Sequence, residues 1–305
     1  MQPNPVLKKL GLSNDDRVAI IHVDDVGMCQ ATIAAFADLH DFGLVSSGAV
    51  MVPCPWFLEA ARFAREHPDA DIGVHLTLNS EWETYRWGPV STRDPQTGLL
   101  DAQGFFHRQS AQTQAHADPE AVARELEAQV QRAIESGVIP THADTHMGTV
   151  AHMKFMQSYI QLALKYKVPP MMLRLDEAGW RMVAGQHRGV ALDESAVALA
   201  AQIVHTLEDM GVPLLDSISH LSLEADPATR LDQAKCAFDG LKPGITHFII
   251  HAAKDTPELR ALAPDWACRA ADYETFMNEE LRQHIQRTGL HVIGYRAIQS
   301  VMGSA

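Results

Sequence analysis

Short apolar runs rich in β-branched residues recur along this chain, at intervals too long for hairpins and suited to a strand, a helix and two loops. Parallel strands need a crossover connection, which is usually helical, so this alternation predicts a parallel α/β sheet. We expect a TIM-like (β/α) barrel, distorted or short of closure, with a doubly wound open sheet as the alternative. The candidate strands are Val18–Asp25, Ser47–Val52, Ile72–Leu78, Thr141–Asp144, Met171–Leu175, Leu214–Ser219, Thr246–His251 and His291–Tyr295.

Capping signals mark the helices expected between these strands. Asp118 can accept hydrogen bonds from free backbone N–H groups, and Pro119 follows at a position that needs no donor. The apolar stripe after them and the stop at Gly137 predict a helix over 119–136. Asp226-Pro227 opens a second helix in the same way.

Length and charge limit the classes of protein to which this chain can belong. Its 305 residues suit one barrel domain, residues 1–305, around a continuous core. Lys+Arg 25 against Asp+Glu 38 leaves a net charge of −13, which disfavours nucleic acid and anionic membranes as partners. No signal peptide or membrane-spanning run is visible, so we expect a cytoplasmic protein. The oligomeric state stays open, a homodimer included.

Several candidate strands end at a carboxylate or an imidazole. Asp24 and Asp25 end the first, His75 lies in the third, and His251 ends the seventh. The carboxyl ends of barrel strands are where catalytic groups gather, so these side chains are expected to meet there. Taken alone, the Asp pair would more often cap the helix that begins near Gln30, and His75 would more often be a hydrogen-bonded core residue.

A further cluster surrounds the fourth candidate strand. His142, Asp144 and His146 follow at period two, so they project to one side if the strand persists. This is a moderately specific ligand pattern, although His-x-x-x-His also arises by chance in a chain with sixteen histidines. His247 and His251 likewise share one face of the seventh strand.

A site made of one carboxylate and two imidazoles, with positions left for water, suits Zn²⁺, Fe²⁺ or Co²⁺ better than the oxygen-rich shell of Mg²⁺. We therefore expect one divalent metal ion, with Zn²⁺ favoured and Mg²⁺ or another divalent ion as the alternative. Open positions indicate catalysis, and one of two adjacent carboxylates can take a proton from water at the metal.

Residues 79–116 break the rhythm of strands and helices. This stretch is rich in Trp, Tyr, Arg, Pro and Gly and follows directly on the third strand, so we expect a substrate-covering loop. Its cluster of Trp82, Tyr85, Arg86 and Trp87 can stack on a sugar ring and donate to hydroxyls. A locally packed aromatic lid without ligand contact is an equal alternative.

The order of these motifs resembles the YdjC-type chitooligosaccharide deacetylases, distant relatives of the polysaccharide deacetylases. The resemblance extends from about Val18 to about Tyr295, and the third motif is the most specific. Two departures bear on the sugar pocket: Val26 stands where the family usually has Phe, and Met147 follows the last motif histidine where further histidines are common. The motifs are Asp24-Asp25-x-Gly27, Gly73-x-His75-Leu76, Pro140-Thr141-His142-x-Asp144-x-His146 and a late strand ending at His251.

The resemblance implies that Asp25, His75 and His146 hold the metal. It further implies that Asp24 is the catalytic base and that His251 protonates the leaving amine. Arg174, at the end of the fifth candidate strand, matches a family arginine that orients a carboxylate or the substrate.

The function expected on this basis is metal-dependent removal of acetyl groups from a small N-acetylated sugar or oligosaccharide. A non-haem iron oxygenase is an alternative, because two histidines and a carboxylate also describe its ligand set. A carbohydrate-binding barrel without catalysis is a second alternative. The alternating strands and helices disfavour the first, and the presence of base, ligand and acid candidates disfavours the second.

Overall fold

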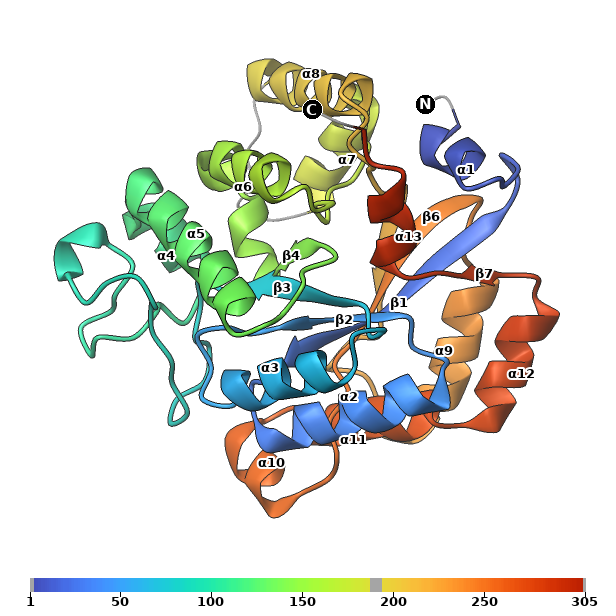
Figure 1. The fold of residues 1–305 in the computed structure, drawn as a ribbon, viewed down its shortest axis with the longest axis horizontal. Helices are drawn as coiled ribbons and strands as arrows, with labels where there is room; N and C mark the ends of the chain where they lie inside the picture. Colours follow the sequence, from blue (N-terminus) through green and yellow to red (C-terminus); the bar gives the residue numbers. More distant parts are fainter. Residues whose placement is uncertain (1–2, 187–193, 304–305) are drawn as a thin grey trace.

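The computed structural model describes residues 3–186 and 194–303, and it confirms the α/β expectation. Its parallel strands lie in the order β4-β3-β2-β1-β6-β5, and β7 pairs with the beginning of β1. The sheet curls into a half-barrel surrounded by helices, a distorted TIM-like barrel (Figure 1). The strands are β1 Arg17–Val26, β2 Ser47–Val50, β3 Ile72–Leu76, β4 Ala143–Thr145, β5 Ser217–His220, β6 Gly244–Ile250 and β7 His291–Val292.

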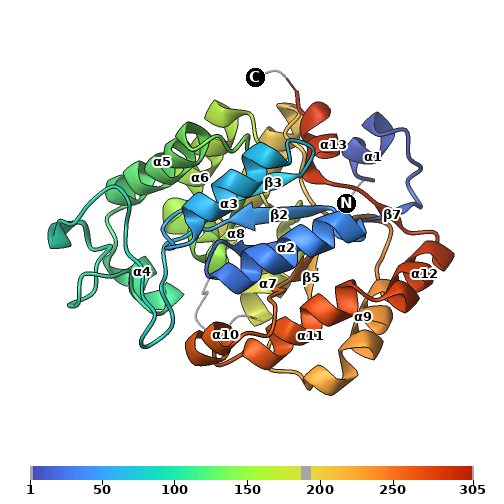
Figure 2. The ribbon, with the colours of Figure 1, turned by 60° about the horizontal axis from the view of Figure 1, so that its bottom comes forward.

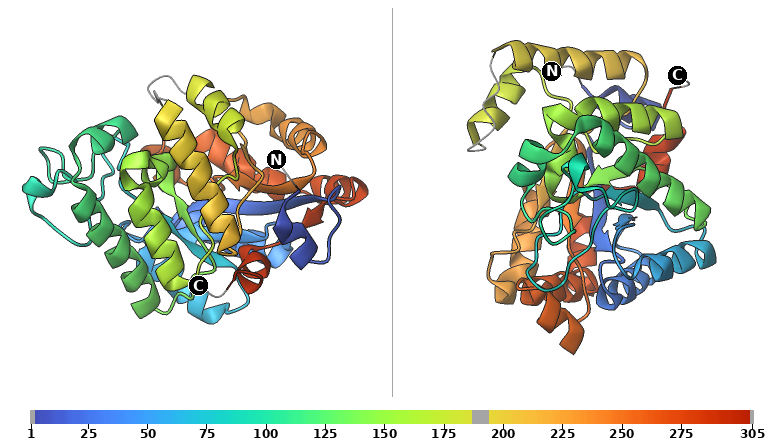
Figure 3. Two further views of the ribbon diagram at one scale, coloured as in Figure 1. Left: turned by 90° about the horizontal axis from the view of Figure 1, so that it is seen from above. Right: turned by 90° about the vertical axis from the view of Figure 1, so that its left-hand side faces the viewer.

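Helices surround the outer face of the curled sheet. Figures 1 and 2 show α2 and α3 side by side with α11, and α5 against α6 farther round the sheet. Helices α7 and α8 lie beyond α6, away from the sheet (Figure 3). The helices are α1 Pro5–Lys9, α2 Gln30–Phe42, α3 Phe57–Glu66, α4 Ser110–His116, α5 Pro119–Glu135, α6 Met153–Tyr166, α7 Glu177–Gln186, α8 Glu194–Asp209, α9 Arg230–Asp239, α10 Pro257–Leu262, α11 Trp266–Phe276, α12 Glu279–Arg287 and α13 Tyr295–Ser300.

The expected capping chemistry is present at two helices. The Asp118 side chain accepts from the Ala121 N–H at the start of α5, as the sequence predicted. Asp226 caps a short 3₁₀ turn, Pro227–Thr229, that leads into α9. Among residues 3–186 and 194–303, no helix combines the length and apolarity needed to cross a bilayer.

The central strand β1 divides its side chains between two environments. Ala19, Ile21 and Val23 belong to the main apolar core, whereas Val18 and Ile20 belong to a smaller cluster. Because side chains alternate along a strand, His22 and Asp24 lie on the same face of β1 as Val18 and Ile20, nearer the carboxyl end of the strand. The half-barrel is therefore apolar at the amino ends of its strands and polar toward their carboxyl ends.

Two of the expected strands do not form regular strands over the predicted residues. The segment Met171–Leu175 makes only an isolated bridge, between Leu173 and Leu215, and Pro170 makes another with Ala143. Pro169 and Pro170 carry no N–H donor, so a regular ladder cannot form through them. The eighth candidate strand is limited to β7, because the chain turns into α13 at Tyr295.

The long loop after β3 lies where the sequence placed it. Residues 79–116 lie beyond the carboxyl ends of β1, β2 and β3, and Figure 3 (right) shows them in front of the sheet when the molecule is seen from that side. The loop contains a 3₁₀ turn, Pro95–Thr97, and the helix α4. A capping box of Gln109 and Gln112 starts α4, a signal that periodicity alone does not reveal.

Candidate metal centre and catalytic groups

Three residues from distant parts of the chain meet at the carboxyl ends of β1, β3 and β4. The Oδ1 atom of Asp25 lies 3.5 Å from Nε2 of His75 and 3.2 Å from Nδ1 of His146. All three side chains are buried, and one ligand atom from each lies within 4.8 Å of the others. Within the described part of the chain, Oδ1 of Asp25 has no hydrogen-bond partner. A buried carboxylate oxygen without a donor, facing two imidazoles, fits a cation.

The backbone at Asp25 explains how two adjacent aspartates serve one site. The pairing of β1 with β2 changes register between Val23 and Val26, and Asp25 has φ 63°. This left-handed conformation is uncommon for a residue other than glycine and marks a bulge near the carboxyl end of β1. As a result the carboxylate of Asp24, 3.8 Å from Nε2 of His75, faces the same space as that of Asp25.

A second carboxylate stands behind each of the two imidazoles. Nδ1 of His75 lies 2.9 Å from Oδ1 of Asp144, and Nε2 of His146 lies 3.0 Å from Oε2 of Glu81. In both rings the other nitrogen faces Asp25. Histidines that ligate metals usually have this arrangement, in which an outer carboxylate fixes the tautomer and the orientation of the ring.

Arg269 holds the remaining oxygen of Asp25. Its Nη1 lies 2.7 Å from Oδ2 of Asp25, and its Nε donates to Asp265 at 2.8 Å. Although burial opposes the charged form, Arg269 and the two histidines keep the pKa of Asp25 well below its usual range. Arg269 thus leaves Oδ1 as the oxygen of Asp25 that faces the cluster.

The same carboxylates raise the pKa values of the imidazoles. Burial disfavours the protonated ring of His146, but Glu81 and Asp25 outweigh it and raise its pKa to about 9. Asp144 and Asp24 likewise raise the pKa of His75 well above its ordinary value, against the effect of burial. Without a cation, protons would therefore supply the positive charge in this cluster.

Asp24 and His251 lie beside the three grouped residues. The Oδ2 atom of Asp24 is 3.8 Å from Nε2 of His251, at the end of β6, and its Oδ1 is 2.7 Å from Nδ1 of His22. Burial opposes ionisation of Asp24, yet neighbouring histidines lower its pKa, so it is a carboxylate at neutral pH. Burial lowers the pKa of His251, and its backbone N–H donates to Asp272.

The structure places Arg174 elsewhere. Its guanidinium is buried and forms ion pairs with Glu208 at 2.7 Å and Asp216 at 3.0 Å. Asp216 also accepts from the N–H of Ile245, at the amino end of β6, while His251 follows the carboxyl end of that strand. The structure therefore does not bring Arg174 together with the other predicted residues. The irregular segment 170–175 leaves its side chain at the opposite end of the sheet.

The aromatic residues of the long loop pack on one another. The ring of Trp82 lies 6.1 Å from Tyr85 and 5.8 Å from Trp87, and both tryptophans are buried. Arg86 donates to Asp101 and to backbone oxygens within the same loop region, and Arg269 lies over the Trp82 ring. These contacts pack the cluster locally, and its contact with a sugar stays a prediction.

Sequence reasoning missed Glu81 and Arg269. Glu81 belongs to a segment without periodicity, so its approach to His146 depends on how the whole loop folds. Arg269 is 244 residues from Asp25 and lies in α11, where its spacing from Asp265 reads as an ordinary i, i+4 surface pair. The spacing of the third motif marks Asp144 as a possible ligand, but no local pattern indicates its contact with His75.

Comparison with known proteins decides the family. The family model described as YdjC-like protein matches residues 18–287. The chain belongs to the YdjC-like family. This confirms the resemblance to the family that the motifs indicated, and the matched range includes Asp25, His75 and His146.

Relatives of this YdjC-like protein carry a consistent description. A carbohydrate deacetylase of Thermus thermophilus is 31% identical over 297 residues, covering 97% of this chain and 99% of the relative. A carbohydrate deacetylase of Thermoanaerobacter pseudethanolicus is 22% identical, covering 92% and 98%. A crystal structure of an Enterococcus faecalis protein, described as a candidate cellobiose-phosphate cleavage protein, superposes with a TM-score of 0.71 at 22% identity and covers 93% of this chain and 99% of its own. That structure supports the fold alone.

Proposed function

We propose that this YdjC-like protein is a metal-dependent hydrolase that removes acetyl groups from small N-acetylated carbohydrates. The observation that carries the proposal is the grouping of Asp25, His75 and His146, with the other nitrogen of each imidazole facing a carboxylate. An isolated salt-bridge cluster needs no outer carboxylates, whereas a catalytic metal centre uses them to orient its ligands. The relatives are named carbohydrate deacetylases, which supports a carbohydrate substrate and removal of an acetyl group.

The ligand set favours Zn²⁺ among divalent ions. It consists of one carboxylate oxygen and two imidazole nitrogens, a mixed set that Zn²⁺ accepts readily and Mg²⁺ does not prefer. When bound, such a cation lowers the pKa of water and polarises an acetyl carbonyl. With three protein ligands, coordination positions remain for water and substrate, which is typical of catalytic sites.

Asp24 suits the role of general base. Its carboxylate is ionised, lies beside His75 and is held by Nδ1 of His22. It can therefore accept the proton that water loses as it attacks the acetyl carbon. The neighbouring side chain of His251 is 20% exposed, so it can reach both Asp24 and a substrate in the open part of the site.

His251 suits the role of general acid. Its lowered pKa means that the ring is mainly neutral at neutral pH, so it needs a proton before it can donate one. Asp24, at 3.8 Å, is the carboxylate that has just taken a proton from water. Passing that proton through His251 to the departing nitrogen gives acetate and a free amine, with the base restored.

Acetate release tests this proposal. Short N-acetylglucosamine oligomers, incubated with the wild-type protein and Zn²⁺, should yield one acetate for each amine formed. Asp24→Asn should lose activity by about 10²–10⁴-fold, because a general base is removed. Asp239→Asn, at an exposed position on α9, is the matched control and should keep wild-type turnover.

Two results would contradict the proposal. Normal turnover by Asp24→Asn would remove Asp24 as the base. Failure of the wild-type protein to release acetate from any N-acetylated sugar, despite saturable binding of the same sugars, would favour a carbohydrate-binding protein without catalysis.

A further inference from the structure

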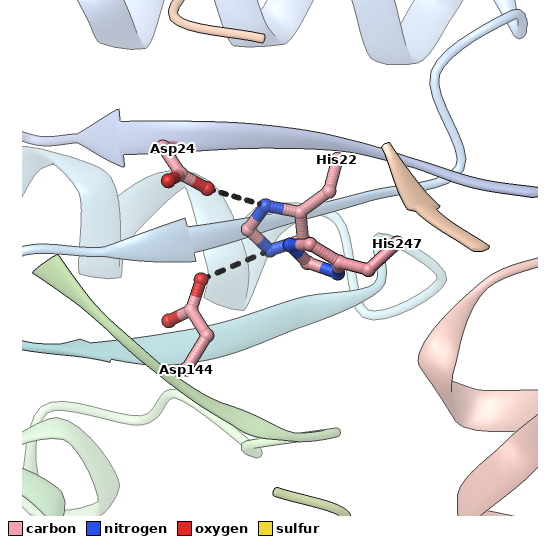
Figure 4. Close-up of side chains that lie close together, drawn as sticks. All are labelled: His22, Asp24, Asp144 and His247. Atoms are coloured by element: carbon pink, nitrogen blue, oxygen red, sulfur yellow. Dashed lines mark hydrogen bonds and ion pairs between the residues drawn. The ribbon is translucent and has the colours of Figure 1, made fainter. Parts of the chain in front are cut away.

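A line of buried polar side chains runs from Asp24 toward the amino ends of the strands. Nδ1 of His22 lies 2.7 Å from Asp24, and Nε2 of His22 lies 2.8 Å from Nε2 of His142. Nδ1 of His142 lies 3.0 Å from the Thr141 hydroxyl, which donates to Asp71. Figure 4 shows His22 reaching Asp24 on one side and Asp144 on the other. We call these five residues, Asp24, His22, His142, Thr141 and Asp71, the buried chain.

The surroundings make room for the buried chain. A Cβ at Gly73 would lie 2.4 Å from the ring of His142, so only glycine lets that ring lie against β3. On its other side Tyr295 stacks on His142, with ring centroids 3.9 Å apart and planes inclined by 14°. A Cβ at Gly294 would likewise lie 2.2 Å from Oδ2 of Asp71. The two imidazoles are fully buried, in a position where a barrel would usually place aliphatic side chains.

The donors and acceptors of the buried chain determine one another. Burial and neighbouring histidines hold the pKa of His142 well below its usual range, so this ring carries one proton. The Thr141 hydroxyl gives its hydrogen to Asp71, so Nδ1 of His142 must donate to Thr141. Nε2 of His142 then carries no hydrogen and faces Nε2 of His22 at 2.8 Å, while Nδ1 of His22 lies 2.7 Å from the Asp24 carboxylate.

Asp71 ends the buried chain far from the site. It directly precedes β3, whereas His75 lies toward the other end of that strand. Burial raises the pKa of Asp71, while the Arg296 backbone N–H and the hydroxyls of Thr141 and Ser47 favour its carboxylate form. An unpaired buried polar group is unfavourable. Removing one member of the buried chain leaves its neighbour without a hydrogen-bond partner, and that neighbour can then reorient.

We propose that His22, His142, Thr141 and Asp71 are positioning residues that hold the Asp24 carboxylate in the orientation needed for catalysis. The inference rests on the proposed function, because it takes Asp24 as the general base. It goes further by assigning a role to residues at the opposite end of the strands. None of the four lies between Asp24 and the open side of the site, so each acts through its neighbour in the buried chain.

Thr141→Val is the sharpest variant, because it removes one hydroxyl, keeps the shape and lies outside the site. It should lower kcat on an N-acetylglucosamine oligomer about 10-fold or more, the range seen when outer partners of catalytic groups are removed. KM and bound Zn²⁺ should stay at wild-type values. Thr246→Val is the matched control, since this buried threonine in β6 bonds Ser217 instead, and it should keep wild-type kcat.

Substitutions at His22 test the contact with the base itself. Asn places its amide nitrogen near the position of Nδ1, so His22→Asn can still donate to Asp24, whereas His22→Ala cannot. We expect kcat to decrease from wild type to His22→Asn to His22→Ala, with metal content unchanged. Equal kcat for wild type, His22→Ala and Thr141→Val would overturn the inference while leaving the proposed function intact.

A spectroscopic readout does not depend on activity. In ¹⁵N-histidine-labelled wild-type protein at pH 7, His142 should be protonated on Nδ1 alone, and Nδ1 of His22, which lies 2.7 Å from Asp24, should carry a hydrogen. Thr141→Val should change the tautomer of His142. An unprotonated Nδ1 on His22 would overturn the inference whether or not the protein releases acetate, whereas absent acetate release with these tautomers in place would count against the proposed function alone.

Discussion

The Nδ1 atom of His75 lies 2.9 Å from a carboxylate oxygen of Asp144, and both side chains are buried. The opposite nitrogen of the ring faces Asp25. One ring thus connects an outer carboxylate to an inner one, and Glu81 repeats the relationship at His146. This duplication makes the cluster a candidate metal centre, and it yields predictions for each outer carboxylate.

Asp144→Asn should weaken Zn²⁺ binding by about 10–100-fold, because the neutral amide no longer fixes the ring of His75 through a charged contact. Zinc affinity measured by competition with a chelator is the appropriate assay. An affinity equal to that of the wild-type protein would show that Asp144 does not support a metal ligand.

Glu81→Gln should have a smaller effect on Zn²⁺ affinity than Asp144→Asn. The side chain of Glu81 is 20% exposed, while that of Asp144 is fully buried, so water can replace part of its interaction. The variant should also lower the pKa of His146 from about 9, since Glu81 helps to raise it. Histidine NMR titration of the metal-free protein checks that shift, and an unchanged pKa would contradict the contact.

Cation binding should depend on pH because His146 must lose a proton to become a ligand. Its pKa of about 9 means that the metal-free protein holds this proton at pH 7.5, so Zn²⁺ binding should release protons and tighten as the pH rises toward 9. Calorimetry in buffers of different ionisation enthalpy measures the release. Binding with no proton release at pH 7.5 would contradict the assignment.

The same pKa predicts how the stability of the metal-free protein varies with pH. The folded-state pKa of His146 is above the ordinary value of 6.5, so protonation favours the folded state. This stabilisation should be complete below about pH 6.5 and lost as the pH rises through about 9. Urea unfolding at several pH values measures it, and Glu81→Gln, with a lower His146 pKa, should show a shallower loss.

His251→Ala should separate the chemical role of this residue from metal binding. Turnover of an N-acetylated sugar should fall by about 10²–10⁴-fold, because the departing nitrogen loses its proton donor. An aryl acetate ester, whose leaving group needs no proton, should be hydrolysed with a much smaller loss. Equal losses on the two substrates would argue against His251 as the acid.

The sequence predicts the site best where a side chain that can bind a metal lies at the end of a regular apolar run. Apolar runs that end at Asp25 and His75 predicted both the parallel sheet and the edge at which these residues meet, because strand direction alone brings carboxyl ends together. The motif order then indicated the family. The register change that turns Asp25 into the site depends on the pairing of β1 with β2, which no local pattern reveals.

Other features depend on tertiary structure that the sequence does not encode locally. Glu81 reaches His146 through an irregular loop, and Arg269 reaches Asp25 from α11. Arg174 is the opposite case: the family resemblance implied that it belongs to the site, but its side chain pairs with Glu208 and Asp216 at the other end of the sheet.

The most direct test of the metal centre is elemental analysis of purified protein that has been stripped of metal and then dialysed against Zn²⁺. Wild-type protein and His116→Ala, an exposed histidine of α4, should each retain about one Zn²⁺ per chain, since a site with three protein ligands takes a single ion. His146→Ala should retain almost none. Full occupancy in His146→Ala would contradict the account, because it would place the metal, and the chemistry that depends on it, somewhere other than between Asp25, His75 and His146.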